Sequence, residues 1–239
     1  MKRNPVLLFT LLAVILFSPM FIVRQVGPFD FWYWMSANLV IVIALGWLVD
    51  PTYKTSLKND IRDGVPLNRD GVPPNRDGVP PDRDGVPPDR DGVPVKVLLG
   101  LASAIVLYFV FFTGNYLSRL LFDFAGEGIA NVYAFKGDAS GIRIALLMLL
   151  VIGPGEELFW RGFLQRHYEN RLGKWGGFLL ATAVYTGVHI FTGNIMLIVA
   201  ALVAGLFWGW MYMRYKSMVM NVVSHTIWDI AVFLVLPFY

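Results

Sequence analysis

The sequence has no cysteine and few charged residues. The absence of cysteine from all 239 residues excludes disulfide bonds, thiolate metal sites and a cysteine nucleophile. Charged residues make up only 15% of the chain, whereas hydrophobic residues make up 56% and the mean hydropathy is +0.56. This composition is typical of a polytopic helical membrane protein. The net charge of +3 does not indicate nucleic-acid binding, and the basic residues instead have the distribution of membrane-topology signals.

Two protease signatures are also missing. The chain contains no His-Glu-x-x-His, the pattern of a zinc protease helix, and no Gly-x-Ser-x-Gly, the pattern of a serine nucleophile turn. Ser224 directly precedes His225, so on a helix the two side chains point to different faces. The sequence therefore argues against these two types of protease.

Long apolar runs predict an all-α fold, a polytopic membrane bundle of about seven transmembrane helices. The runs cover residues 5–23, 29–49, 95–116, 142–155, 175–190, 195–213 and 218–238. The run at 142–155 begins the fourth span, which continues as a polar stretch through Arg166, His167, Glu169 and Arg171. The first run could be a cleaved signal peptide, which would leave six helices. It is long enough to span a membrane and no small-x-small cleavage site follows it, so we interpret it as a retained helix.

The basic residues predict the orientation of the helices. Lys and Arg gather on alternate connections, which places the N-terminus inside and the C-terminus outside. The inner segments hold Lys2, Arg3, Lys54, Lys58, the repeat arginines, Lys96, Arg161, Arg166, Arg171, Lys174, Arg214 and Lys216; the outer segments hold Arg24, Arg119, Lys136 and Arg143. We therefore expect an integral membrane protein of a prokaryotic cell membrane, with a cytoplasmic N-terminus.

A repeat divides the chain. Arg-Asp-Gly-Val-Pro occurs five times with a period of seven, starting at Arg62, Arg69, Arg76, Arg83 and Arg90. Gly and Pro in every unit disfavour a helix, and too few apolar residues are present to form a core, so we predict a disordered linker. The Asp-Arg-Asp-Gly units have a weaker likeness to an Asp-rich calcium loop. The predicted division is two helices in 1–49, the linker in 50–95, a third helix and loop in 96–140, and a core in 141–239.

One stretch places ionisable residues where a membrane helix is predicted. Gly153 to Arg161 holds Glu156, Glu157 and Arg161 at the end of an apolar run. Ionisable side chains at such depth are expensive and mark functional sites by default. Glu157 and Arg161 are four residues apart and can pair on a helix, which leaves Glu156 on another face. The alternative is a structural ion pair where a helix leaves the bilayer.

Two further helices carry polar pairs with the same spacing. Tyr185 precedes His189 by four residues, and His225 precedes Asp229 by four. A carboxylate at this spacing can fix a histidine tautomer. With Glu156 as a free carboxylate, the set suits hydrolysis: a glutamate activates water, and two histidines bind a metal or donate to an oxyanion. His167 is expected at the membrane interface.

These motifs resemble those of the CPBP family of intramembrane proteases, which includes CAAX proteases and bacteriocin-processing or immunity proteins. The family pattern is Glu-Glu-x-x-x-Arg, Phe-x-x-x-His and His-x-x-x-Asn/Asp on three membrane helices. The chain has Glu156 to Arg161 for the first, Tyr185 to His189 for the second and His225 to Asp229 for the third. The resemblance covers about residues 140–235, and Tyr185 replaces the usual Phe.

The resemblance implies an endopeptidase that cleaves a peptide bond near the membrane surface. It implies that Glu156 activates the water, that Glu157 and Arg161 support it, and that His189, His225 and Asp229 complete the site. The expected substrate is a membrane-associated peptide or protein, and the expected environment is the lipid bilayer. Zn²⁺ bound by Glu156, His189 and His225 and a metal-free glutamate mechanism both stay open, because a Glu156 that binds zinc is no longer a free base.

Alternative functions also stay open. The same scaffold could serve a non-catalytic immunity or secretion partner, and a proton-coupled transporter could use the same ionisable groups, although the two halves of the membrane region show no repeat. The predicted helix ends raise a further difficulty. They place Glu156 and His225 nearer the inner face and His189 nearer the outer face, so the fifth helix would have to begin deep, tilt strongly or be partly re-entrant.

Overall fold

The computed structural model describes residues 5–50, 53–55, 57 and 92–238. Within this part of the chain almost all residues are helical, which confirms the all-α membrane bundle, and the sheet there is a short hairpin of β1 (Gln25–Val26) and β2 (Phe29–Asp30). Residues 58–91 carry most of the repeats and lie outside the described residues. The predicted disordered linker and the calcium alternative therefore stay predictions.

Most of the helices follow the apolar runs of the sequence. In chain order they are α1 (Pro5–Val23), α2 (Phe31–Val49), α4 (Val93–Leu121), α5 (Ala125–Tyr133), α6 (Gly141–Leu147), α7 (Gly153–Glu156), α8 (Arg166–His189), α9 (Ile195–Tyr215) and α10 (Met218–Ile230). The 3₁₀ turns are η1 (Ala134–Lys136) and η4 (Ile190–Thr192), and the π-helical turns are η2 (Met148–Ile152), η3 (Glu157–Gln165) and η5 (Ala231–Val235). Side chains of Asp30, Asn194 and Ser217 accept backbone N–H groups at the starts of α2, α9 and α10, as N-caps do.

Five helical stretches of the described chain are long and apolar enough to cross a membrane. They are Val6–Val23, Phe31–Val49, Val93–Leu121, Ile195–Tyr215 and Met218–Val235, and they agree with five of the predicted spans. The predicted spans at 142–155 and 175–190 are not among the described stretches that meet these criteria of length and hydropathy. They belong to longer helical paths that carry the polar motifs.

The span predicted at 175–190 agrees with the second arm of α8, and the span that begins at 142 extends well past residue 155. The helical path that begins with α6 continues through η2, α7 and η3 into the first turns of α8, and the backbone reverses at Gly173, where φ is +76°. Glycine adopts this left-handed φ without steric cost. A Cβ at Gly177 would overlap the backbone of Glu169, which shows how closely the two arms of the hairpin approach.

This hairpin removes the difficulty over the depth of His189. Glu156 lies 17 residues before Gly173 and His189 lies 16 residues after it. At about 1.5 Å per residue, both are about 25 Å from the turn and therefore at the same level. The fifth helix needs no deep start or re-entrant path, because the fourth helix extends well past Glu156.

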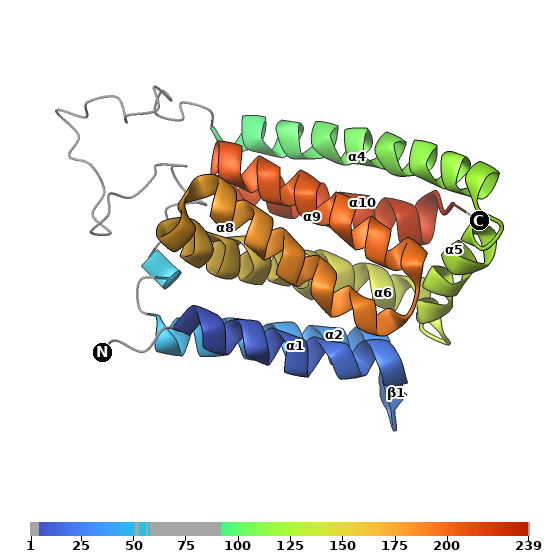
Figure 1. Cartoon of the computed structure of the whole chain (residues 1–239), viewed down its shortest axis with the longest axis horizontal. Helices are drawn as coiled ribbons and strands as arrows, with labels where there is room; N and C mark the ends of the chain where they lie inside the picture. The colour runs from blue at the N-terminus through green and yellow to red at the C-terminus, as the bar shows by residue number, and fades with distance from the viewer. Residues whose placement is uncertain (1–4, 51–52, 56, 58–91, 239) are drawn as a thin grey trace.

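Figure 1 shows the long helices side by side along one axis of the molecule. The start of α1, the end of α2, the start of α4 and the turn within α8 lie at one end of the bundle, and α5, β1 and the C-terminal end lie at the other. The described residues make seven passes: α1, α2, α4, the path through α6 and η3, the second arm of α8, α9, and α10 with η5. The chain is an integral membrane protein with its described ends on opposite sides of the bundle.

The helix of the first motif packs against the N-terminal helices. Phe9 and Phe17 of α1 are 1% exposed. The ring of Phe9 lies 4.5 Å from that of Phe163, and the ring of Phe17 lies 5.7 Å from that of Trp160. The α1 helix is thus part of the packed bundle and covers one side of η3.

Candidate active site

Wide helical turns surround the Glu-Glu-x-x-x-Arg motif. Pro154 lies in the first turn of the short helix α7, and π-helical turns precede and follow this helix. The helix is therefore widened around Pro154 rather than interrupted there. The hydroxyl of Tyr53 donates to the carbonyl of Leu158 at 2.6 Å, which satisfies a main-chain group of η3. Turns of this kind are frequent at functional sites.

Glu157 is the most enclosed carboxylate of the motif. It is 0% exposed, and its Oε1 accepts from Arg161 at 2.8 Å and from His225 Nδ1 at 2.6 Å. Asn221 Nδ2 donates to the second oxygen at 2.9 Å. The expected pairing with Arg161 is present, and His225 and Asn221 of α10 join it. With three donors from two elements, Glu157 fixes the position of α10 against η3.

Glu156 has looser partners. The hydroxyl of Tyr185 donates to its Oε2 at 3.3 Å, and His225 Nε2 lies 3.4 Å from the same oxygen. Asp229 Oδ2 lies 3.5 Å from this ring nitrogen. Two carboxylates that face one ring nitrogen repel each other unless a proton lies among the three groups, so this arrangement favours a shared proton.

His225 is held on both ring nitrogens and on its face. Nδ1 donates to Glu157, and the Trp208 ring stacks on the imidazole with centroids 3.6 Å apart and an interplanar angle of 18°. Trp208 Nε1 donates to Ser224 Oγ, and its carbonyl accepts from Asn221. The sequence analysis missed the roles of Trp208 and Asn221. For Asn221, a polar residue one turn before His225 on the same face was an available signal.

His189 lies on the second arm of the α8 hairpin and lines the same cavity as Glu156. Its Nδ1 bonds to the carbonyl of Tyr185 at 2.8 Å, and its ring lies 4.9 Å from that of Phe21. Because a carbonyl only accepts, Nδ1 carries the proton. In the neutral ring Nε2 is then an acceptor, suited to hold a water or a metal rather than to donate to an oxyanion. Of the two roles expected for the histidines, this tautomer of His189 favours binding over donation.

A glycine brings α7 and α10 together. A Cβ on Gly153 would overlap Thr226 Oγ1 and would lie 3.0 Å from Thr226 Cβ. Only glycine leaves room for this approach. It lets the backbone next to Glu156 reach the helix that carries His225 and Asp229. His167, by contrast, lies away from this group and pairs with Asp50 at 3.2 Å.

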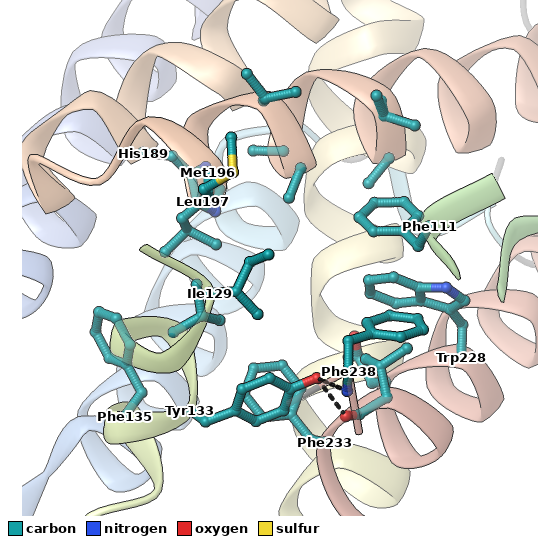
Figure 2. A pocket seen from close by; sticks show the side chains of 18 of the residues that line it. Phe111, Ile129, Tyr133, Phe135, His189, Met196, Leu197, Trp228, Phe233 and Phe238 are labelled. Carbon is teal, nitrogen blue, oxygen red and sulfur yellow. Dashed lines mark hydrogen bonds between the residues drawn. The ribbon is translucent and has the colours of Figure 1, made fainter. Parts of the chain in front are cut away.

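A mostly apolar cavity of about 360 Å³ meets this cluster of polar side chains. Its polar lining includes Glu156, Tyr185, His189, His225 and Asp229. Figure 2 shows it from close by, with the rings of Phe111, Phe135 and Trp228 among its walls. The cavity therefore offers a place beside the carboxylates for apolar side chains of a peptide or for an apolar attached group.

Residues near the C-terminal end cover part of this cavity. The Phe238 ring lines it, and the Phe238 N–H donates to the hydroxyl of Tyr133 at 2.8 Å. The same hydroxyl donates to the carbonyl of Val232 at 3.1 Å (Figure 2). Arg119 Nη2 donates to the carbonyl of Phe238 at 3.0 Å. This segment thus joins α4, α5 and η5 on one side of the cavity.

The fit of a zinc ion can be judged from the same side chains. Among the described residues, no group of three or more His, Asp or Glu side chains is placed to hold a metal ion. His225 Nδ1 is used by Glu157, and its Nε2 faces Glu156 and Asp229. As they stand, Glu156, His189 and His225 do not form a three-ligand site, so we derive no catalytic step through a metal.

Comparison with known families assigns the part of the chain that holds this site. A family model described as Type II CAAX prenyl endopeptidase Rce1-like matches residues 138–231. We call the residues that this match covers the Rce1-like region. The match agrees with the resemblance to the CPBP family, and the Rce1-like region contains all three motifs. Comparisons with curated proteins and with solved structures found no match.

The family match and the fold agree on a general activity. The match to an endopeptidase family, together with helices apolar enough to span a membrane, supports an intramembrane endopeptidase in general. The first motif lies at the junction of α7 and η3, the second on α8 and the third on α10, and all three lie within the Rce1-like region.

Proposed function

We propose that the protein hydrolyses a peptide bond of a membrane-associated peptide or protein, with Glu156 as the base that activates water. The observation that carries this proposal is the difference between two neighbouring carboxylates. Glu157 accepts from three side chains and is fully enclosed, whereas the bonds to Glu156 reach only Oε2, beside the cavity. Glu156 therefore has an oxygen available for a water molecule.

The residues divide the steps of hydrolysis. Glu156 and the acceptor Nε2 of His189 hold the water, and Glu156 takes its proton as the hydroxide adds to the peptide carbonyl carbon. The proton shared by His225 and Asp229 stabilises the oxyanion. Collapse of the tetrahedral intermediate breaks the C–N bond, and the proton held by Glu156 passes to the leaving amine. Glu157, Arg161 and Asn221 keep His225 in place.

The family description and the cavity indicate the class of substrate. CAAX-type proteolysis acts next to an apolar group on the substrate, and the apolar cavity beside Glu156 has room for such a group. We propose a substrate that enters from the lipid bilayer and is cut near the membrane surface. Arg166, Arg171 and Lys174 lie close to the turn at Gly173 in the sequence, and Lys216 pairs with Glu169 of the same turn. These basic residues favour a cytoplasmic location for that end of the bundle, in a prokaryotic cell membrane.

Cleavage of a fluorogenic library of membrane peptides by detergent-purified protein tests the proposal. Wild type, Glu156→Gln and Glu169→Gln are compared, with and without a chelator. Glu169 pairs with Lys216 and lies 13 residues away from Glu156 along the chain, so it serves as the control. We expect Glu156→Gln to lower cleavage by about 10²–10⁴-fold, the range for loss of a general base, and Glu169→Gln to cleave like wild type.

The outcomes separate the alternatives. Activity that resists the chelator and depends on Glu156 supports the metal-free mechanism. Activity lost to the chelator and restored by Zn²⁺ supports a metalloprotease with Glu156, His189 and His225 rearranged as ligands. Equal behaviour of wild type and Glu156→Gln across the library contradicts an endopeptidase and favours the non-catalytic scaffold.

A further inference from the structure

Tyr185 stands where the resembled family has phenylalanine, and its hydroxyl has a specific partner. It donates to Glu156 Oε2 at 3.3 Å, the same oxygen that lies 3.4 Å from His225 Nε2. A phenylalanine at this position would leave that bond unmade. The substitution in this chain thus adds a donor to the carboxylate that the proposed reaction uses.

The ring of Tyr185 is fixed from several sides. It packs edge-on against Trp160 with centroids 5.2 Å apart, and the guanidinium carbon of Arg161 lies 5.0 Å from the ring centroid. Gly205 of α9 leaves the space for the ring, because a Cβ there would lie 3.2 Å from Tyr185 Cδ1. Tyr185 is 6% exposed. A side chain held in this way keeps its hydroxyl in one place.

Tyr185 also connects the two groups that hold the water. Its hydroxyl reaches Glu156, and its carbonyl accepts from His189 Nδ1 at 2.8 Å. The two bonds set the carboxylate and the imidazole relative to each other through a single residue. With Oε2 bonded to Tyr185 and facing His225, Oε1 is the oxygen of Glu156 that is directed to a water.

We propose that Tyr185 is a positioning residue, whose hydroxyl orients the Glu156 carboxylate so that Oε1 faces the attacking water. This inference rests on the proposed endopeptidase function. Tyr185 acts through Glu156 and need not touch the substrate. Replacing Tyr185 with phenylalanine, the residue usual in the resembled family, should therefore lower the activity of this protein.

The test compares Tyr185→Phe with Tyr168→Phe in the full-length protein. Both changes remove one buried tyrosine hydroxyl from α8, and Tyr168 bonds to Thr10, away from the cavity. With a peptide that the wild type cleaves, we expect Tyr185→Phe to lower kcat by about tenfold or more with KM unchanged, since it removes a hydrogen bond to a charged group used in the reaction. Tyr168→Phe should retain the wild-type kcat, and both variants should keep the wild-type melting temperature within a few degrees.

A second measurement does not depend on activity. The infrared difference between wild type and Glu156→Gln identifies the carboxyl band of Glu156. Tyr185→Phe should shift this band, and Tyr168→Phe should leave it in place. If the band shifts but the wild type cleaves no peptide, the Tyr185–Glu156 hydrogen bond is supported and the proposed endopeptidase activity is contradicted. An unshifted band, an unchanged kcat, or an equal loss in Tyr168→Phe would overturn the positioning role.

Discussion

The helices α4 and η3 differ in how much of their surface is buried within the bundle. The α4 helix has 29 residues and a hydropathy of 2.3 over its most apolar stretch, yet only 22% of that stretch is buried in the bundle. In η3, eight of nine residues are buried, including Glu157 and Arg161. Hydropathy therefore identifies the helices that face lipid, whereas the polar helices depend on their neighbours for shielding.

This difference shows that ionisable groups lie where neighbouring helices supply partners for them. A charge in the middle of the exposed face of α4 would lie in lipid, where its desolvation has no compensation. In η3 each ionisable group has a partner from η3 itself or from α10. Apolar helices such as α1, α2 and α4 enclose the helices that carry the motifs. The four predictions below test this division, from the largest expected effect to the smallest.

Glu157→Gln should have the largest effect on stability. It leaves Arg161 buried without its counter-ion, and breaking a buried pair in this way costs about 3–5 kcal/mol. Chemical unfolding in detergent micelles would measure the change. Asp30→Asn is the control, since Asn still caps α2 and the Asp30–Arg143 pair is partly exposed, so a loss of at most about 1 kcal/mol is expected. Equal losses would contradict the contrast between buried and exposed pairs.

Gly153→Ala should separate α7 from α10. The added methyl overlaps Thr226 Oγ1, and overpacking of this kind costs about 1–3 kcal/mol. Because Glu156 and His225 lie on the two helices concerned, cleavage should fall as well. Gly187→Ala has no atom within 4 Å of its new methyl and provides the control for both measurements. A stable and active Gly153→Ala protein would argue against the close approach.

Gly100→Ala should have a smaller effect, on the one face of α4 that is packed. Its Cβ would lie 2.8 Å from Val223 Cβ and 2.9 Å from the carbonyl oxygen of Met220, both on α10. We expect a loss of about 1 kcal/mol in the free energy of unfolding. Cleavage should change little, because Gly100 does not line the cavity.

Gly114→Ala should have the smallest effect and the opposite sign. It lies on the same helix as Gly100, but nothing lies within 4 Å of the added methyl. Alanine favours a helix over glycine by at most about 1 kcal/mol, so unfolding in micelles should show no loss or a slight gain. A loss larger than that of Gly100→Ala would show that α4 is packed differently from the arrangement described.

Sequence reasoning predicted the apolar helices better than the polar ones. Apolar runs are self-contained signals, so α1, α2, α4, α9 and α10 follow from the residues alone. The polar stretch after Gln165 was expected to continue the fourth span, but its residues do not predict where the path through η3 into α8 reverses. The reversal depends on the close contact of Gly177 with the backbone of Glu169, which no local sequence pattern predicts.

The contacts of the candidate site were likewise predictable from the sequence only in part. The i,i+4 spacing predicted the Glu157–Arg161 pair, which the structure contains. Spacing did not predict that His225 would bond to Glu157 through Nδ1, or that Asn221 and Trp208 would hold it. The tautomer of His189 follows from the hydrogen bond between its Nδ1 and the carbonyl of Tyr185, which spacing alone did not predict.

The sequence by itself determined that this is a helical membrane protein and which ionisable residues are exceptional in it. Both follow from the cost of placing polar groups in lipid, which applies residue by residue. The tertiary structure decided which carboxylate is tied and which is available. That depends on the turn at Gly173 and the close approach at Gly153, because distances between helices are set by packing rather than by local sequence.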